Sequence, residues 1–242
     1  LLAMAGVRSQ RPVGPQAAVS WETLVAGVRF VWRTKLILAT ITLDLLAVLL
    51  GGVTYLLPVF AEDVLQVGPD GMGLLQSAEA IGAVAMAVLL THLPPMRRAG
   101  RILLWSVAGY GVATIGFGPS PWFWLSMGMM LLIGALDNIS VVVRHTLVQM
   151  LTPDEMRGRV SAVNNIFIVA SNDLGGMESG VTAHFFGPKL AAVIGGVGAL
   201  FVVLGVGRVW PEILAIGSLR DVRPADAARA EEQADEELAG RT

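Results

Sequence analysis

The chain has 242 residues, of which 54% are hydrophobic and 15% are charged, and its mean hydropathy is +0.66. A water-soluble domain of this length is far less apolar, so the composition predicts a membrane protein. The absence of cysteine excludes disulfide scaffolds, thiolate metal sites and cysteine nucleophiles. The net charge of −2 says little about partners, and we expect none of them to be a nucleic acid.

Residues 1–35 are predicted to form a cytoplasmic linker. The segment from Leu1 to Ser20 has neither an initiator Met nor the pattern of a signal peptide, so we expect the chain to begin within a longer protein. From about residue 20 to residue 33, apolar side chains recur at helical spacing opposite charged ones. This pattern predicts an amphipathic helix that lies on the cytoplasmic surface of the membrane.

Residues 36–210 are predicted to cross the membrane six times, because runs of roughly 17 to 25 apolar residues span a hydrocarbon core of about 30 Å. The predicted spans are Leu36–Phe60, Gly73–Leu93, Ile102–Phe117, Trp122–Val143, Val160–Phe186 and Leu190–Trp210. The fifth span is the most polar of them. Residues 211–242 are predicted to form a polar cytoplasmic tail, which is rich in Ala and Glu from Arg220 onward.

The seventeen Lys and Arg residues are distributed unevenly around these spans. All of them except Lys189 fall on one side of a serpentine drawn through the six spans. Basic residues beside membrane-spanning helices are retained in the cytoplasm. We therefore expect a protein of the inner, or plasma, membrane, with both ends of this chain in the cytoplasm.

Four of the six spans carry carboxylates, whereas the third and the sixth have no charged residue in their apolar cores. The acids are Asp44, Glu79, Asp137, Asp173 and Glu178. A carboxylate inside a membrane costs at least about 2.5 kcal/mol on insertion scales and marks a functional site by default. The order of two acidic spans and one uncharged span occurs twice. It predicts two inverted three-helix repeats in an all-α half bundle of six helices.

Asp44 and Asp137 are the leading candidates for proton coupling or substrate contact, with Glu178 next. For Asp44 the alternative is a hydrogen bond to a neighbouring helix, and for Asp137 it is a structural pairing. Arg144 follows Asp137 on the same helix face, at roughly 10 Å, which is too far for a direct ion pair unless a side chain flexes. Glu79, near the outer end of its span, is a further candidate, and contact with solvent at the external mouth is the alternative for it.

Two rows of polar side chains follow the fifth span. One row contains Asn164, Ser171 and Glu178, and the neighbouring row contains Asn165, Asn172 and Ser179. Such a stripe predicts contact with an aqueous pathway or with the opposing half of a larger protein, and polar packing between helices is the alternative. Gly176 and Gly180 form a GxxxG pattern, which is typical of close helix packing.

No motif in the sequence predicts an enzyme. HExxH, GxSxG and paired metal ligands do not occur, and His92, His145 and His184 lie far apart near span ends. We therefore expect no catalytic residue, no metal site and no bound cofactor.

Several long stretches match one known family. The most specific are LDLLAVLLGG and LLPVFAEDVL from Leu43 onward, residues 134–165, and SNDLGGMESG at residues 171–180. They resemble the C-terminal six-helix half of a major facilitator superfamily transporter, in the branch that includes the enterobactin exporter and related multidrug effluxers. The resemblance runs from about Trp21 to Trp210. It implies that the first helix of each triplet lines a cavity and that the third is peripheral.

The resemblance also implies a cytoplasmic latch. RRAGR at residues 97–101 is similar to a loop motif of the superfamily, in which the matching positions are Arg98, Gly100 and Arg101. In the family this loop holds the inward-closed state through charge contacts with helix ends. The gate or latch candidates at the next cytoplasmic turn are Arg144, Arg157 and Arg159. Simple anchoring by positive charge is the alternative for these arginines. The chain departs from the family pattern at Glu79, Asp173 and Gly176.

We therefore expect a secondary active transporter that works by alternating access, in which proton entry drives the efflux of an amphipathic small molecule such as a drug or siderophore. The expected partners are membrane lipid, an N-terminal six-helix half of the same transporter and the small-molecule substrate. The alternative is a complete six-span protein that self-associates as a channel or a structural subunit.

Overall fold

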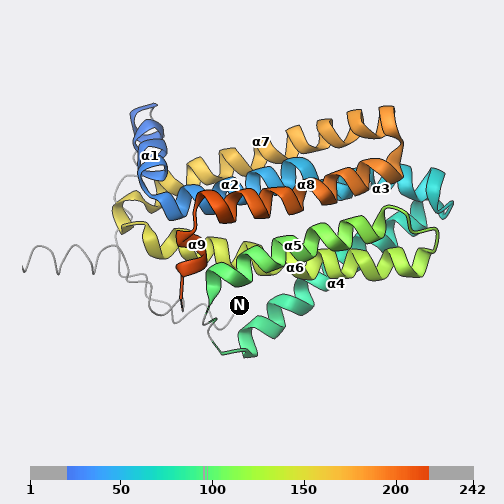
Figure 1. Ribbon diagram of the computed structural model, residues 1–242, viewed down its shortest axis with the longest axis horizontal. Coiled ribbons are helices and arrows are strands. Elements are labelled where there is room, and N and C mark those ends of the chain that lie inside the picture. The colour runs from blue at the N-terminus through green and yellow to red at the C-terminus, as the bar shows by residue number, and fades with distance from the viewer. Residues whose placement is uncertain (1–20, 95, 97, 218–242) are drawn as a thin grey trace, which may run out of the picture.

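A computed structural model describes residues 21–94, 96 and 98–217, so the start of the predicted linker and most of the predicted tail lie outside the described residues. The described residues form an all-helical bundle (Figure 1). Its long helices are α1 (Trp21–Arg33), α2 (Lys35–Gly51), α4 (Gly68–His92), α5 (Ala99–Phe117), α6 (Phe123–Leu151), α7 (Asp154–Phe186) and α8 (Pro188–Val209).

Five helical segments are long and apolar enough to cross a membrane. They are Lys35–Val64, which includes α2, together with α4, α5, α6 and α8. The predicted fifth span corresponds to α7, whose 33 residues are more than enough to cross a bilayer of about 30 Å. It does not belong to the apolar five because charged and amide side chains run along its whole length.

The helices pack in two groups of three that lie beside each other (Figure 1). In one group α2 contacts α7 and α8, and in the other α6 contacts α4 and α5. The groups meet mainly where α5 packs on α8. The first predicted triplet corresponds to α2, α4 and α5, and the second to α6, α7 and α8. Each observed group therefore contains two helices of one triplet and the first helix of the other. The inverted relation between the triplets stays a prediction.

The first predicted span is not one continuous α-helix. α2 ends at Gly51, and Gly52 has a non-helical backbone with φ −66° and ψ 52°. A 3₁₀ turn, η2 (Val53–Leu56), a short helix, α3 (Leu57–Val59), and a π-helical turn, η3 (Phe60–Val64), follow. Breaks of this kind occur at glycine pairs and at π-turns. The predicted span from Leu36 to Phe60 lies within the membrane-crossing segment Lys35–Val64, and the Gly51–Gly52 pair interrupts its α-helix.

The fourth predicted span was ended too early. α6 continues without a break to Leu151, so Arg144 lies inside the helix, beyond the predicted end of the span, and is only 4% exposed. The chain turns at Thr152 and Pro153, and α7 begins at Asp154. In the sequence, the charge of Arg144 indicated the end of a span. In the structure, this charge is paired with Asp44 on α2.

The start of the predicted polar tail is folded. A short helix, α9 (Glu212–Ala215), buries Ile213 and Ile216, and Gly217 accepts a hydrogen bond of 3.0 Å from the backbone N–H of Ala99 at the start of α5. Gly100 makes this docking possible, because a Cβ at this position would overlap the backbone carbonyl of Ile213. The last membrane-crossing helix, α8, ends at Val209, so this folded segment lies beyond it, at the start of the predicted tail.

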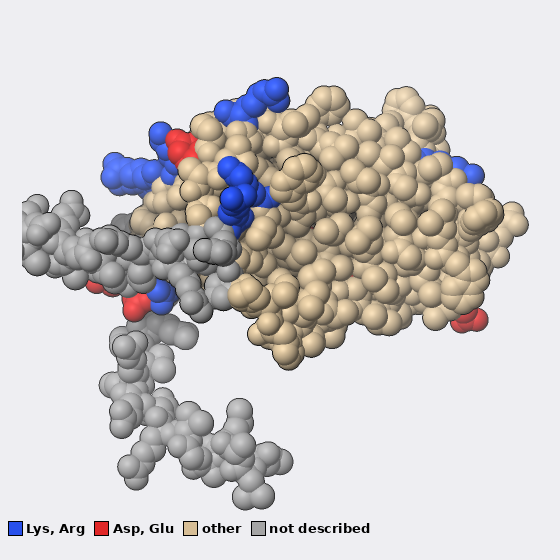
Figure 2. Space-filling model, turned by 60° about the horizontal axis from the view of Figure 1, so that its bottom comes forward, with Lys and Arg blue, Asp and Glu red and all other residues tan. Residues whose placement is uncertain are grey.

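Basic side chains gather at one end of the bundle. In the view of Figure 2 most of the blue side chains lie toward the left, which in Figure 1 is the end that carries α1 and α9, and a smaller blue area lies at the opposite end. Between these ends the visible surface is almost free of charge. This distribution is typical of a bundle whose middle contacts lipid.

Candidate functional site

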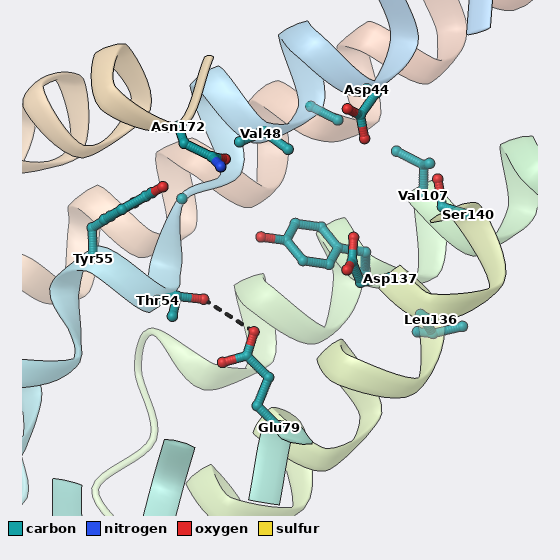
Figure 3. Close-up of a pocket in the computed structure, with 13 residues that line it drawn as sticks. Asp44, Val48, Thr54, Tyr55, Glu79, Val107, Leu136, Asp137, Ser140 and Asn172 are labelled. Atoms are coloured by element: carbon teal, nitrogen blue, oxygen red, sulfur yellow. Dashed lines mark hydrogen bonds between the residues drawn. The ribbon is translucent and has the colours of Figure 1, made fainter. Parts of the chain in front are cut away.

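A cavity of about 240 Å³ lies inside the bundle and receives side chains from both helix groups (Figure 3). Three of its lining residues are acids from different helices, namely Asp44 on α2, Glu79 on α4 and Asp137 on α6. The neutral polar lining residues are Thr54, Tyr55, Tyr110, Ser140 and Asn172. Apolar side chains such as Val48, Val107 and Leu136 complete the wall. An ionisable cavity within an otherwise apolar bundle is a functional site by default.

Asp44 and Arg144 form an ion pair between α2 and α6 at one side of this cavity. The side chain of Arg144 is 5% exposed and that of Asp44 is 14% exposed. The Nε atom of Arg144 has no hydrogen-bond partner among the residues that the structure describes. The two charges neutralise each other, so Asp44 does not contribute a free negative charge to the cavity.

Glu79 is held by the crossing of α4 and α6. Its carboxylate accepts a hydrogen bond of 3.3 Å from the hydroxyl of Thr54 on η2. The crossing is close because a Cβ at Gly134 would overlap the carbonyl of Glu79, and a Cβ at Gly82 would overlap the carbonyl of Leu131. Two glycines therefore let the two backbones touch at the point where the Glu79 side chain enters the cavity.

Asp137 follows Gly134 by almost one helical turn, so it lies close to the same crossing. Its carboxyl group points toward the space that the Glu79 carboxyl group also faces (Figure 3). Asp137 is exposed, and within the described part of the chain its side chain makes no hydrogen bond or ion pair. Ser140, almost one turn further on, is only 5% exposed, and its hydroxyl lines the cavity without a partner among the described residues.

Tyr110 supports the break in α2 from the side of α5. Its hydroxyl donates a hydrogen bond of 2.7 Å to the carbonyl oxygen of Gly51, the last residue of α2. This carbonyl has lost its helical partner because the helix ends there. A second contact comes from Ser179 on α7, whose hydroxyl donates to the carbonyl of Gly52 at 3.3 Å. The break thus presents η2, with Thr54 and Tyr55, to the cavity.

The other acids of the predicted pathway lie elsewhere. Asp173 is exposed, and Glu178 accepts a hydrogen bond of 2.8 Å from Thr182 on its own helix. Neither lines the cavity, and Asn165 is exposed outside it, whereas Asn172 does line it. The predicted stripe on α7 is therefore divided between the cavity, exposed positions and contacts with other helices.

The packed part of α7 is polar as well. Asn164, Ser171 and Ser179 are buried, and α7 packs against α2. The close approach is at Gly175, where a Cβ would lie 2.8 Å from the carbonyl of Val48. The predicted GxxxG glycines contribute less, since a Cβ at Gly180 would meet no atom within 4 Å.

The latch candidates at the basic end do not form one cluster with the cavity. Arg98 and Arg101 are exposed near the start of α5. Arg157 forms an ion pair with Asp154 and donates from Nε to the carbonyls of Gln149 and Thr152, both at 3.3 Å. These bonds satisfy carbonyls at the end of α6, and they give Arg157 a role in the turn. Arg159 is exposed and lies 3.5 Å from the Met156 sulfur atom.

Sequence reasoning missed Thr54, Tyr110 and Ser140 as lining residues. Thr54 enters the cavity only because α2 breaks at Gly52, and the Gly51–Gly52 pair was the signal for this break. Tyr110 lies on the third span, which was expected to be peripheral, and its contact with α2 has no local signal. Among the described residues no group of His, Cys, Asp and Glu has the arrangement of a metal site.

The apolar helices and the cavity lined by three acids together define a multi-pass membrane protein. A family model described as the Major Facilitator Superfamily matches residues 2–176, and the chain belongs to this superfamily. Among curated relatives, the chain is 27% identical over 181 residues to the enterobactin exporter EntS of Escherichia coli O1:K1 / APEC, of Escherichia coli O157:H7 (strain EC4115 / EHEC) and of Shigella boydii serotype 18 (strain CDC 3083-94 / BS512).

The aligned region covers 75% of this chain and 43% of each of these relatives. The chain therefore spans less than half the length of the relatives it matches. No solved structure matches the chain at a significant level.

Proposed function

We propose that this chain is one six-helix half of a secondary active transporter that exports an amphipathic small molecule in exchange for protons. The observation that carries the proposal is the cavity in which Glu79 and Asp137, from two helices that cross at Gly134, face a common space. Carboxylates in such a site can bind a proton from one side of the membrane and release it to the other. Proton entry at 100 mV supplies about 2.3 kcal/mol per charge.

The open side of the cavity supports a second half. Asp137 and Tyr55 line the cavity and are nevertheless exposed, so this wall is incomplete in the chain described here. The relatives are more than twice as long as the aligned region. An N-terminal half of the same protein would close the cavity, and the two halves would open it to each side of the membrane in turn. Self-association of the chain is the competing way to cover this wall.

The orientation follows from the charges. We place the basic end of the bundle in the cytoplasm and the whole bundle in the inner membrane, because positive residues are retained on the cytoplasmic side. In this orientation Arg98 and Arg101 are exposed at the cytoplasmic end and are available to contact helix ends of the other half. Gly100, between these two arginines, lies against the backbone of Ile213.

Transport by the intact protein in proteoliposomes tests the proposal. The probes are ethidium, fluorescein and enterobactin, which differ in charge and include the substrate that names the relatives. At least one should move against its gradient when a proton gradient is imposed and stop when an uncoupler is added. Glu79→Gln and Asp137→Asn should remove the response to the proton gradient, whereas Glu62→Gln, an exposed acid outside the cavity, should retain it. Absence of gradient-driven movement of all three probes would overturn the proposal.

A further inference from the structure

We propose that the cavity selects organic cations, with the carboxylates of Glu79 and Asp137 as the charge-recognising groups and an amphipathic amine as the ligand class. This inference rests on the proposed transport function and adds the substrate class to it. It is carried by the balance of charges in the cavity and by Ser140, a 5% exposed lining residue whose hydroxyl has no partner among the described residues.

The charges around the cavity do not cancel. Three carboxylates line it, and the one basic group of the described residues that is paired with any of them is Arg144, whose partner is Asp44. Glu79 is contacted by a neutral hydroxyl group, and Asp137 by no hydrogen-bond or ion-pair partner in the described part of the chain. Two acids thus lack a cationic partner, and a charge in a site of low polarity needs a counter-charge.

The geometry brings these two acids to one ligand-sized space. Gly134 allows the backbone of Glu79 to touch α6, and Asp137 lies almost one turn further along that helix. Their carboxyl groups face the same cavity of about 240 Å³ (Figure 3). A cation in this space would be attracted by both groups, and an anion would be repelled by both. Protons and the cation would compete for the same carboxylates, which is the exchange that an antiporter requires.

The rest of the lining suits the body of an amine. Tyr55 and Tyr110 offer aromatic rings, which attract cations through their π faces. Val48, Val107 and Leu136 provide apolar surface for a hydrocarbon group. Ser140 also lines the cavity, and its hydroxyl oxygen is an acceptor for an ammonium N–H group.

Three probes with one body and different head groups test the inference. They are 4-phenylbutylammonium, 4-phenylbutanol and 4-phenylbutyrate, which are cationic, neutral and anionic at neutral pH. Their binding to the intact protein in lipid nanodiscs is measured by calorimetry against empty nanodiscs, with no gradient present. We expect the ammonium to bind about tenfold more tightly than the alcohol and the carboxylate to show no saturable binding.

The variants assign the preference to residues. Glu79→Gln and Asp137→Asn should each weaken ammonium binding several-fold and leave the affinity for the alcohol unchanged, because a neutral head group does not respond to the carboxylates. Glu62→Gln, whose acid is exposed outside the cavity, is the matched control and should bind all probes as the unaltered protein does. If the variants fail to fold, the comparison of the three probes on the unaltered protein still decides whether the cavity prefers a cationic head group.

Equal affinity for the ammonium and the alcohol, or unchanged ammonium binding when both acids are neutralised, would overturn the inference. These results are distinguishable from a failure of the proposed function. Proton-driven efflux together with binding that ignores head-group charge would refute cation selection alone. Charge-dependent binding without efflux of any probe would refute transport alone.

Discussion

Arg144 on α6 is ion-paired with Asp44 on α2, and this pair is a charged connection between the two helix groups of the bundle. Both side chains are largely buried, and α2 and α6 otherwise make few contacts. The pair therefore fixes the distance between the helices that line opposite sides of the cavity. It also leaves Glu79 and Asp137 as the cavity acids without a cationic partner among the described residues.

Neutralising one member of this pair should destabilise the protein more than neutralising both. Arg144→Gln leaves the Asp44 carboxylate unpaired, and breaking a buried ion pair on one side costs about 3–5 kcal/mol. Asp44→Asn should have a similar effect, because it leaves the guanidinium unpaired. The double variant loses both charges and should be far less destabilised than the sum. Thermal unfolding of the four proteins in nanodiscs measures this coupling, and additive losses would show that the two groups do not interact.

The crossing of α4 and α6 gives a second prediction. Gly134→Ala places a methyl group on the carbonyl of Glu79, so the helices must separate, and overpacking of this kind costs about 1–3 kcal/mol. Ligand binding should weaken too, because Glu79 moves with α4. Gly128→Ala is the control on the same helix, since a Cβ there meets no atom within 4 Å. It should be neutral or slightly stabilising. Equal stabilities of the two variants would argue against the close crossing.

The sequence was informative wherever the signal was local. Hydropathy located the long helices, and the carboxylates inside them predicted three cavity acids, because a charge in an apolar helix stands out without knowledge of its neighbours. The partner of Asp44 was not predictable in this way. Hydropathy ended the fourth span before Arg144, and only the packing of α2 beside α6 shows that this arginine is buried with a counter-ion. The docking of α9 was not predicted either, because so short a segment has no recognisable hydrophobic periodicity.

Tyr110 supplies a third prediction, at the break of α2. Tyr110→Phe removes the hydroxyl that donates to the Gly51 carbonyl at 2.7 Å and leaves this oxygen without its partner on α5. A lost hydrogen bond of this kind costs about 1 kcal/mol. Removing the bond should also increase amide hydrogen exchange in η2, because the break then keeps the Ser179 hydrogen bond but loses the one from α5. Ser106→Ala is the control on the same helix, since its hydroxyl donates to the carbonyl of Leu103 in its own helix, at 2.8 Å. Exchange in η2 that is the same in both variants would contradict this role of Tyr110.

The docking of α9 on α5 gives the last prediction. Gly100→Ala should displace α9, because its methyl group would overlap the Ile213 carbonyl and crowd the Cβ of Ile216. Ile213 and Ile216 would then be exposed, and the segment around residue 212 should become sensitive to protease. Gly207→Ala is the control at the basic end of α8, since a Cβ there meets one side-chain carbon of Leu104 at an ordinary 3.8 Å. Limited proteolysis in nanodiscs compares the two. Because the Lys35–Glu212 ion pair at 3.7 Å is largely exposed, it contributes little, and Lys35→Met should leave the protease pattern almost unchanged. Protection of residue 212 in Gly100→Ala that equals the protection in Gly207→Ala would show that the glycine contact does not hold α9 in place.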